Sequence, residues 1–409
     1  MQDGEPFRSE SHWTSVHNWA DPPSFPDEIT FHDTTFRDGE QQPGVVFDED
    51  EKVELGTRFS EAGIDRLEPG FPPVSDADKR AITRLADAGL DADVFALSRC
   101  VKADVELALE CGVDGVILEI PSSKHLLEHA YDWSYEQAIE YAIEATEYAG
   151  EQGLHVSFFC VDASRADPED FLSILNRVVD EGHADSVNVV DTFGGLSPEG
   201  TRAIVRVVAE AFDLPIEIHT HNDFGLGVAN TLAALSAGAE IAHTTVMGLG
   251  ERSGNANFEE VATALRALYG VDLDLDYGAF TDLAEATAAA AGVDMPVSKP
   301  IVGQNQFGME AGLIVHWWNK LQKKDMPLTL FPYHWDLVGN DAPKVTVGKM
   351  SGLATVVYWC ERLGLAVPDD SEQEEILASI KAVSIAEKRP LELDEFVSIY
   401  RRVLGLETT

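Results

Sequence analysis

The chain has 409 residues, 44% of them hydrophobic, which is enough for one large domain and a smaller appendage. Its 72 acidic residues outnumber the 29 basic ones and give a formal net charge of −43, which repels nucleic acid and anionic membranes. No apolar run approaches the roughly 18 residues of a membrane span, and the first residues lack the features of a secretory signal, so we expect a cytoplasmic protein.

The first 25 residues are polar and aromatic, and residues 1–25 are predicted to form an N-terminal arm. From residue 26 onward, short β-branched or aromatic runs alternate with longer segments of helical periodicity. The predicted strands are Ile29–Phe36, Arg66–Glu68, Val94–Arg99, Gly115–Ile120, His155–Asp162, Ser186–Asp191, Ile216–His221 and Ala242–Gly248. A helix is predicted over Ser134–Gly153, and two others begin at Asp167 and Ser197 with proline at the first helical position.

Eight βα units of about 30 residues predict an α/β fold, a (β/α)8 TIM barrel over residues 26–275. The pattern then changes to an alanine-rich helix over Thr281–Gly292 and a Pro/aromatic stretch, predicted as a linker and first helical subdomain over residues 276–345. An acidic linker near Pro368–Glu375 precedes two final helices, and residues 346–409 are predicted as a second helical subdomain.

Two motifs are predicted to meet at the C-terminal ends of the strands, where such barrels place their chemistry. Arg37 and Asp38 follow the first strand, and His219 and His221 lie two residues apart on the seventh, so both imidazoles face the same side. A carboxylate and two imidazoles suit a divalent metal such as Mg, Mn, Zn or Co, and an adjacent arginine can neutralise charge on a substrate oxygen. The alternative is buried core histidines and a surface salt bridge, which the joint occurrence of both motifs disfavours.

Other polar residues are predicted at the same end of the barrel. Glu68 ends the second strand and Arg99 the third. The glycine-rich stretch Met247–Asn257 follows the eighth strand, where Asn255 can offer a side-chain oxygen to the metal. A glycine-rich loop alone usually marks only a tight turn, but this position favours contact with a ligand.

Five stretches carry a resemblance to a known family, namely DTTFRDGEQQPG (Asp33–Gly44), LEPGFPPVS (Leu67–Ser75), DASR (Asp162–Arg165), DTFGGLSPE (Asp191–Glu199) and HTHNDFGLGVAN through GLGERSGNANFEE (His219–Glu260). Over about residues 25 to 270 the chain resembles the metal-dependent Claisen-condensing synthases of the pyruvate carboxyltransferase-like barrels. These are the 2-isopropylmalate, homocitrate and citramalate synthases. Weaker similarity continues through Asp336–Gly352.

The resemblance implies acetyl-CoA and a 2-oxo acid as substrates, release of CoA, and a homodimer. It implies these roles: metal ligation by Asp38, His219, His221 and Asn255, alkoxide stabilisation by Arg37, carboxylate binding by Thr192, and orientation of ligands or water by Glu68. No stretch corresponds to the feedback domain of many 2-isopropylmalate synthases, so leucine-type feedback is not expected.

Three departures from the family pattern affect the catalytic base. The fifth strand reads Val161-Asp162-Ala163 where the family has Glu-Asp-Ala. In the subdomain, Ile314 and Leu330 occupy the positions of the expected histidine and tyrosine. His316, Tyr333 and His334 are the candidates for this proton-transfer role. An interpretation of equal weight is that they belong to an aromatic subdomain core with Trp317 and Trp318.

The predicted pocket is largely apolar, because alternation puts Ser157, Phe159 and Val161 on one face of the fifth strand. An unpaired carboxylate buried beside Phe and Val is unfavourable, so a monocarboxylic 2-oxo acid such as pyruvate or 2-oxoisovalerate is favoured. Arg99 and His125 remain candidates for binding a distal carboxylate, and Ser157 for binding substrate.

Two other functions fit parts of the sequence. One is a metal-dependent carbon–carbon lyase of the 3-hydroxy-3-methylglutaryl-CoA lyase type, although the cysteine that this lyase carries in its glycine-rich loop is absent from Met247–Asn257. The other is a non-catalytic paralogue that binds metal and metabolite. The four cysteines (Cys100, Cys111, Cys160 and Cys360) are scattered without CxxC spacing, which argues against a disulfide framework or structural zinc.

The acidic residues are spread along the chain rather than gathered in a tail. An acidic partner-binding surface is one interpretation. A solvated acidic shell that keeps the protein soluble in high salt, where self-repulsion is screened, is favoured, and it suggests a halophilic source.

Overall fold

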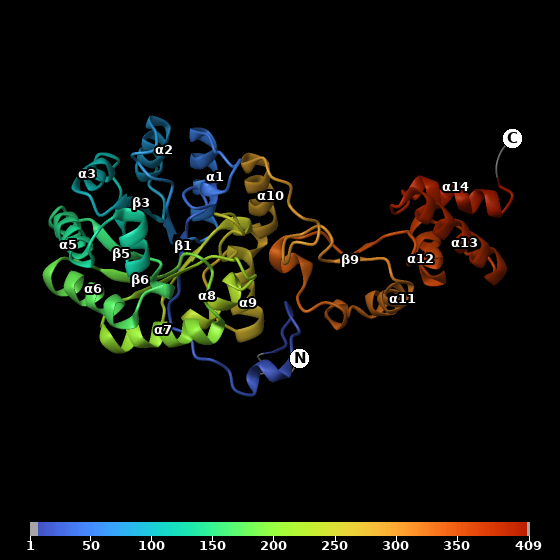
Figure 1. Cartoon of the computed structure of the whole chain (residues 1–409). Coiled ribbons are helices and arrows are strands. Elements are labelled where there is room, and N and C mark those ends of the chain that lie inside the picture. Colours follow the sequence, from blue (N-terminus) through green and yellow to red (C-terminus); the bar gives the residue numbers. More distant parts are fainter. Residues whose placement is uncertain (1–6, 407–409) are drawn as a thin grey trace. The chain divides into compact units, whose positions relative to one another are not determined.

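Strands and helices alternate from Thr30 to Tyr269 in the computed structural model, which describes residues 7–406. The strands are β1 (Thr30–Asp33), β2 (Arg66–Leu67), β3 (Asp93–Arg99), β4 (Gly115–Pro121), β5 (His155–Val161), β6 (Ser186–Asp191), β7 (Ile216–Thr220) and β8 (Ile241–Thr244). All pairs are parallel and follow chain order, and β1 also pairs with β8, so the sheet closes into a barrel. The predicted TIM barrel is confirmed, with its helices outside the strands (Figure 1).

The helices of the barrel unit are α1 (Glu49–Glu61), α2 (Asp76–Ala86), α3 (Lys102–Glu110), α4 (Lys124–Leu126), α5 (Tyr135–Glu151), α6 (Pro168–Glu181), α7 (Pro198–Ala211), α8 (Gly227–Leu235), α9 (Phe258–Tyr269) and α10 (Phe280–Ala291). The side chains of Ser134, Asp167 and Ser197 cap α5, α6 and α7 by accepting hydrogen bonds from backbone N–H groups of the first turn. These three helices begin where the sequence predicts.

Five strands end before the predicted residue: β2, β5 and β7 end one residue early, whereas β1 and β8 end three and four residues early at the mouth of the barrel. β1 ends at Asp33 instead of Phe36, because the Asp33 carboxylate accepts hydrogen bonds from the backbone and hydroxyl of Thr35 and turns the chain. β8 ends at Thr244, and the following turn holds Met247 at a φ of 62°. The extra residues form the loops that carry the candidate site.

The chain divides into two units, described separately. One is His17–Met295, which contains the barrel; the other joins the chain up to Val16 with the chain from Pro296 onward. Of the predicted N-terminal arm, residues 1–6 lie outside the described residues, as do residues 407–409 of the predicted second subdomain. Among the residues that the structure describes, no helix is long and apolar enough to cross a membrane.

Within the described residues, the second unit contains a two-stranded sheet, four α-helices and short 3-10 helices. Its elements are β9 (Gly308–Met309), β10 (Lys344–Val345), α11 (Gly312–Leu321), α12 (Leu353–Leu363), α13 (Asp370–Glu387) and α14 (Leu393–Val403). The acidic linker predicted over Pro368–Glu375 is wrong in extent, because α13 begins at Asp370. Asp369 and Glu372 form its capping box, and acidic side chains stabilise the first turn of a helix.

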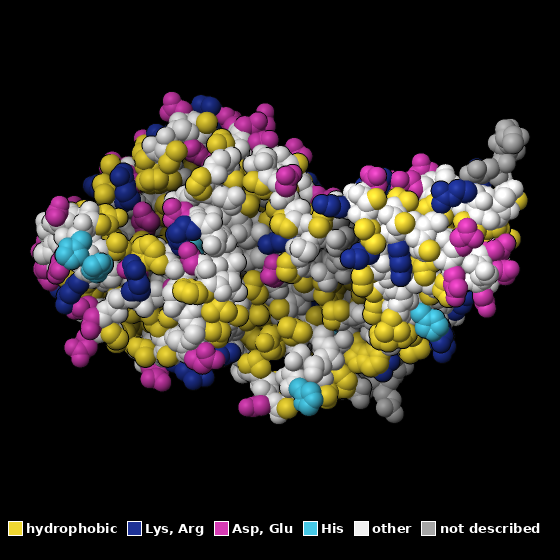
Figure 2. Space-filling model, turned by 45° about the vertical axis from the view of Figure 1, so that its right-hand side comes forward, with side chains coloured by type: hydrophobic (Ala, Val, Ile, Leu, Met, Phe, Trp, Pro, Cys, Tyr) yellow, Lys and Arg dark blue, Asp and Glu magenta, His cyan; other side chains and the backbone are white. Residues whose placement is uncertain are grey.

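Apolar side chains fill part of the barrel interior below its mouth. The cluster comprises Phe95, Leu97, Ile117, Phe159 and Val190, with Phe71 and Val161 packed against it. The outer surface carries many acidic side chains, shown in magenta along the outline of the view in Figure 2. The barrel thus has an apolar interior below its mouth and an acidic outer surface.

Candidate active site

Asp38, His219 and His221 come together at the mouth of the barrel. Asp38 lies in the turn after β1, His219 lies on β7, and His221 immediately follows that strand. Oδ2 of Asp38 is 3.5 Å from Nε2 of His219 and 3.7 Å from Nε2 of His221, and the two Nε2 atoms are 3.4 Å apart. All three residues are buried. The side chains that the sequence assigns to one cavity are therefore neighbours.

The separations among these three ligand atoms suit a single cation. Two ligand atoms about 2.1 Å from an ion at a tetrahedral angle are roughly 3.4 Å apart. Burial lowers the pKa of His221 to about 4 and also lowers the pKa of His219, so both imidazoles are neutral and offer lone pairs. Burial alone would raise the pKa of Asp38, but the positive charge of Arg37 beside it holds that pKa well below its usual range.

Arg37 joins the Asp38 cluster to Glu68. Its Nη1 donates to Oδ2 of Asp38 at 2.8 Å, and its Nε donates to Oε1 of Glu68 at 2.9 Å. Its Nη2 is buried and makes no hydrogen bond with any described residue. Arg37 therefore has one donor free for an anionic or carbonyl oxygen.

Asn255 closes the site from the loop after β8. Its Nδ2 donates to Oδ1 of Asp38 at 2.8 Å and to the carbonyl of Leu249 at 3.0 Å, while its buried Oδ1 has no partner among the described residues. Gly250 makes this contact possible, because it has a φ of 154° and a Cβ there would lie 2.2 Å from Nδ2 of Asn255. The glycine-rich loop therefore brings an orphaned carbonyl oxygen beside Asp38.

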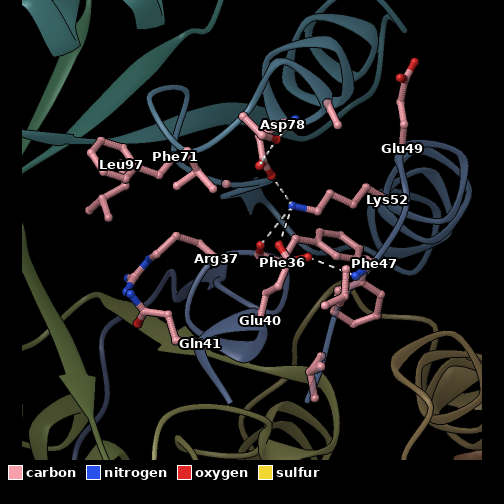
Figure 3. Close-up of a pocket in the computed structure, with 16 residues that line it drawn as sticks. Phe36, Arg37, Glu40, Gln41, Phe47, Glu49, Lys52, Phe71, Asp78 and Leu97 are labelled. Atoms are coloured by element: carbon pink, nitrogen blue, oxygen red, sulfur yellow. Dashed lines mark hydrogen bonds and ion pairs between the residues drawn. The ribbon is translucent and has the colours of Figure 1, made fainter. Parts of the chain in front are cut away.

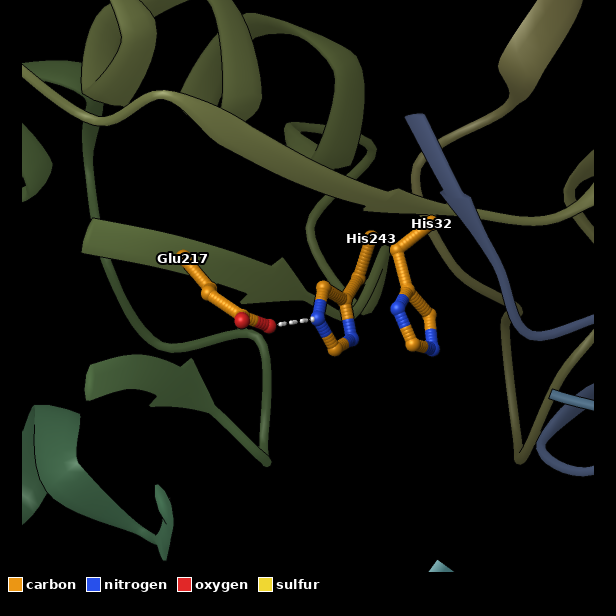
Figure 4. A group of neighbouring side chains, drawn as sticks. All are labelled: His32, Glu217 and His243. Atoms are coloured by element: carbon orange, nitrogen blue, oxygen red, sulfur yellow. Dashed lines mark hydrogen bonds and ion pairs between the residues drawn. The ribbon is translucent and has the colours of Figure 1, made fainter. Parts of the chain in front are cut away.

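A second group of potential ligands lies inside the barrel: His32 on β1, Glu217 on β7 and His243 on β8 (Figure 4). The rings of His32 and His243 stack 4.2 Å apart at an interplanar angle of 7°. The lone pairs of stacked, parallel imidazoles lie in separate planes, which is unfavourable for binding one ion. Glu217 is already hydrogen-bonded to His243 at 2.6 Å and to Ser186 at 2.5 Å. This arrangement fits a buried polar network better than a metal site.

A pocket of about 440 Å³ opens beside Arg37, between the loops that follow β1 and β2 (Figure 3). Most of its wall is apolar and includes Phe36, Val45, Val46, Phe47, Phe71, Val74 and Leu97. Lys52 lies buried at one side, where its Nζ contacts Glu40 and Asp78, each at 2.6 Å. These ion pairs connect α1 to the loop after β1 and to the first turn of α2, beside the pocket.

The three residues predicted to bind substrate differ in their surroundings. The hydroxyl of Thr192 accepts a hydrogen bond from the backbone N–H of Asp162 at 2.7 Å and keeps its own proton to donate. Ser157 is fully buried on β5, and its hydroxyl has no partner among the described residues. Arg99 is half exposed, and its Nε and Nη2 donate to Oδ2 and Oδ1 of Asp104, at 2.7 and 3.0 Å.

The candidate proton-transfer residues His316, Tyr333 and His334 belong to the second unit. His316 is exposed on α11, beside Trp317, which is also exposed. Tyr333 is buried, and its ring meets Phe307 edge-on at 5.7 Å. The rings of His334 and Trp335 lie 3.8 Å apart at an interplanar angle of 30°. The proposed aromatic subdomain core thus includes Tyr333.

Sequence reasoning missed two charged residues near the mouth. Lys52 is fully buried on α1, and nothing in a helix of this composition distinguishes it from a surface lysine. Glu119 lies on β4 at an inward position within the apolar run GVILEIP. A charged residue at an inward position of an otherwise apolar strand is a signal that could have identified Glu119.

Comparison with known proteins places this geometry in context. A family described as HMGL-like matches residues 28–287. Homocitrate synthase AksA of Methanopyrus kandleri is 40% identical over 358 residues, covering 88% of each chain. A probable 2-isopropylmalate synthase of the same organism is 39% identical over 356 residues, covering 87% of this chain and 70% of that protein. A putative (R)-citramalate synthase CimA, also from M. kandleri, is 36% identical over 388 residues, covering 94% and 74%.

Solved structures support the fold. Bacillus subtilis HMG-CoA lyase superposes with a TM-score of 0.59 at 20% identity, covering 66% of this chain and 96% of the lyase. The carboxyl transferase domain of Rhizobium etli pyruvate carboxylase superposes with a TM-score of 0.52 at 17% identity, covering 69% and 51%. At these identities the likeness concerns the barrel alone.

Proposed function

Because the chain belongs to the HMGL-like family, we propose that it is an acyltransferase that condenses acetyl-CoA with a 2-oxo acid and releases CoA. The proposal is supported by relatives of 36 to 40% identity that are named homocitrate, 2-isopropylmalate and citramalate synthases. The single observation that carries it is the convergence of Asp38, His219 and His221 within 4.8 Å at the barrel mouth.

Asp38, His219 and His221 would hold a divalent metal, with Asn255 as the fourth protein ligand. The fit rests on the mutual separations of the three ligand atoms, the neutral imidazoles and the orphaned Oδ1 of Asn255. When bound, the ion supplies Lewis-acid polarisation of the keto group of the 2-oxo acid. Asp38 is held in its ionised form by Arg37, which keeps the ligand set ready for a cation.

Arg37 and Thr192 would bind the oxygens of the 2-oxo acid. The free Nη2 of Arg37 is suited to stabilise the oxygen that becomes an alkoxide when the new carbon–carbon bond forms. The hydroxyl of Thr192 has a proton to donate to the substrate carboxylate. Glu68 accepts from Nε of Arg37 and orients its guanidinium, so we assign it a positioning role.

The side chain of the 2-oxo acid is proposed to be apolar. Leu97, Ile117, Phe159 and Val190 line the barrel interior beside the site, where an unpaired second carboxylate would be costly. Of the two candidates for pairing with such a carboxylate, Arg99 already donates two side-chain hydrogen bonds to Asp104, and His125 is exposed on α4. A monocarboxylic acid such as pyruvate or 2-oxoisovalerate therefore fits better than a dicarboxylic one.

The pocket beside Arg37 is proposed to take the thioester end of acetyl-CoA. Its volume of about 440 Å³ and its wall of Val45, Phe47 and Phe71 suit an uncharged, extended acyl-pantetheine arm. The ion pairs of Lys52 with Glu40 and Asp78 would hold the walls of the pocket in place while the arm is bound.

A thiol-release assay tests the function. Acetyl-CoA is incubated with pyruvate, 2-oxoisovalerate or 2-oxoglutarate, each with Mg²⁺ or Mn²⁺ in high salt, and free CoA is measured. Release with one of the monocarboxylic acids is expected, and release with 2-oxoglutarate alone would contradict the proposed specificity. Silence with every acid, combined with cleavage of a hydroxyacyl-CoA, would favour the lyase.

The lyase alternative has weaker support. Its solved structures share only about a fifth of their residues with this chain, and the loop Met247–Asn257 contains no cysteine. All four cysteines are buried elsewhere. A homodimer, which the family resemblance leads us to propose, can be tested by light scattering at high salt.

A further inference from the structure

Glu119 places a carboxyl group inside the barrel, beside the candidate site. It lies on β4, where Gly115, Ile117 and Glu119 alternate on the same face. Ile117 belongs to the interior apolar cluster, which establishes that this face points inward. In the parallel register Glu119 lies opposite Arg99 of β3 and Phe159 of β5. Its neighbours on the inward face are therefore Arg99 and Phe159, which lie beside the candidate site.

Glu119 differs from the buried carboxylates around the barrel mouth in having no hydrogen-bond partner among the described residues. Buried carboxylates on or directly after the barrel strands all accept hydrogen bonds, namely those of Asp33, Asp38, Glu68, Asp162, Asp191 and Glu217. Glu119 is partly buried, and its carboxylate accepts none from any residue that the structure describes. A carboxylate that holds no structural partner is available to act on a ligand.

The surroundings of Glu119 connect it to the reacting groups. Phe159, its register partner, packs edge-on against His219 at 5.3 Å and lies under the Arg37 guanidinium at 5.8 Å. Burial raises the pKa of Glu119, and the charges of Arg37 and Glu68 act on it in opposite directions. A carboxyl with a raised pKa is a stronger base than an exposed one.

The neighbouring strand, β5, lacks a carboxyl group that the family resemblance predicts there. Val161 of β5 occupies the place where the resemblance predicts a glutamate, and it packs against the apolar cluster instead. Pro121 is the β4 residue that pairs with Val161, so Glu119 faces the interior one inward position earlier, on the adjacent strand. Glu119 of β4 therefore supplies a carboxyl group on the side of the barrel mouth where β4 and β5 lie.

We propose that Glu119 is the general base that removes a methyl proton from acetyl-CoA, an inference that rests on the proposed function. The methyl C–H bond breaks, the proton passes to a carboxylate oxygen of Glu119, and the electron pair forms the enolate of the thioester. The enolate carbon then bonds to the keto carbon of the 2-oxo acid, whose oxygen takes the electron pair beside Arg37. Water hydrolyses the thioester and releases CoA.

The test compares Glu119→Gln, Glu119→Asp and the exposed control Glu140→Gln, with kcat measured on acetyl-CoA and on its methyl-deuterated form. Glu119→Gln should lower kcat by about 10² to 10⁴-fold and leave the KM of the 2-oxo acid and the affinity for Mn²⁺ within about threefold. Its deuterium isotope effect should exceed that of the wild type, because C–H cleavage becomes rate-limiting. Glu119→Asp should recover part of the rate.

Other outcomes overturn the proposal. A Glu119→Gln variant within about threefold of wild-type kcat contradicts it, as does a loss confined to KM or Mn²⁺ affinity with an unchanged isotope effect. Melting temperatures of all variants identify a folding defect, and in that case the isotope effect of the folded Glu119→Asp variant decides. A wild-type enzyme that releases no CoA with any 2-oxo acid contradicts the proposed function itself. The assignment of Glu119 as its general base is then contradicted as well.

Discussion

The side-chain amide of Asn255 donates a hydrogen bond of 2.8 Å to Oδ1 of Asp38 and so joins the loop after β8 to the turn after β1. Because Oδ1 is held in this way, Oδ2 of Asp38 faces His219 and His221 at 3.5 and 3.7 Å. The β1–β8 pairing that closes the barrel brings these two loops together. Closure of the sheet and alignment of the candidate metal ligands are thus coupled.

Asn255→Ala should weaken Mn²⁺ binding by about 10 to 100-fold, because it removes both the donor that orients Asp38 and a potential ligand oxygen. Calorimetric titration of metal-free protein with Mn²⁺ measures the change. The exposed neighbour Ser253→Ala, in the same loop, serves as the control and should bind like the wild type. Equal affinities for the wild type and Asn255→Ala would exclude Asn255 from the site.

The sequence predicted the barrel and the Asp38–His219–His221 convergence for one physical reason. Parallel strands in a closed barrel all end at the same rim, so residues at predicted strand ends must be neighbours even when they are far apart in the chain. Alternation along β7 then fixed the side to which His219 points.

Pairings across the barrel could not be predicted in the same way. The stack of His32 on His243 and the ion pairs of buried Lys52 depend on which side chains meet, and this follows from tilt and register rather than from local pattern. Glu119 was missed because the apolar residues around it dominate the strand signal. Arg99 was predicted to bind substrate because it lies at a strand end. Its hydrogen bond to Asp104, in the first turn of the following helix α3, could not be predicted from the strand pattern.

Acid should destabilise the fold through His32. Burial lowers the pKa of His32 from 6.5 to about 3, so the unfolded chain binds a proton more readily than the folded one. The stability that this neutral imidazole contributes is present above pH 6.5 and is lost as the pH falls toward 3. Each pKa unit is worth about 1.4 kcal/mol, so the loss between pH 7 and pH 4 is on the order of 3 kcal/mol.

His32→Phe keeps a flat ring against His243 and removes the titrating group, so its free energy of unfolding should fall less steeply between pH 6.5 and pH 4. Denaturant unfolding at several pH values measures the slope. The exposed His129→Gln is the control and should retain the wild-type slope. Parallel curves for the wild type and His32→Phe would show that His32 does not cause the acid sensitivity.

Arg99→Ala should change the KM of a monocarboxylic 2-oxo acid by no more than about twofold. The guanidinium is half exposed and already donates to Asp104, so it contributes little to substrate binding. Because the Asp104 carboxylate is buried, the melting temperature of the variant is measured alongside its kinetics. Steady-state kinetics with pyruvate, 2-oxoisovalerate and 2-oxoglutarate provide the measurement. A selective loss of activity on 2-oxoglutarate would instead identify Arg99 as a partner of a second carboxylate.

Low salt should destabilise the whole protein. With 72 acidic and 29 basic residues, like charges repel over a Debye length that is about 10 Å at 0.1 M salt and about 3 Å at 1 M. The melting temperature should therefore rise steadily as KCl increases from about 0.1 M to about 1 M and beyond. An unchanged melting temperature over this range would remove the interpretation of the acidic surface as an adaptation to salt.

The most direct test of the metal site is anomalous scattering from crystals of the protein equilibrated with Mn²⁺. One anomalous peak per chain is expected within bonding distance of Asp38, His219 and His221. No peak at that position, or a peak at His32, Glu217 and His243 in its place, would contradict the site on which the proposed chemistry depends.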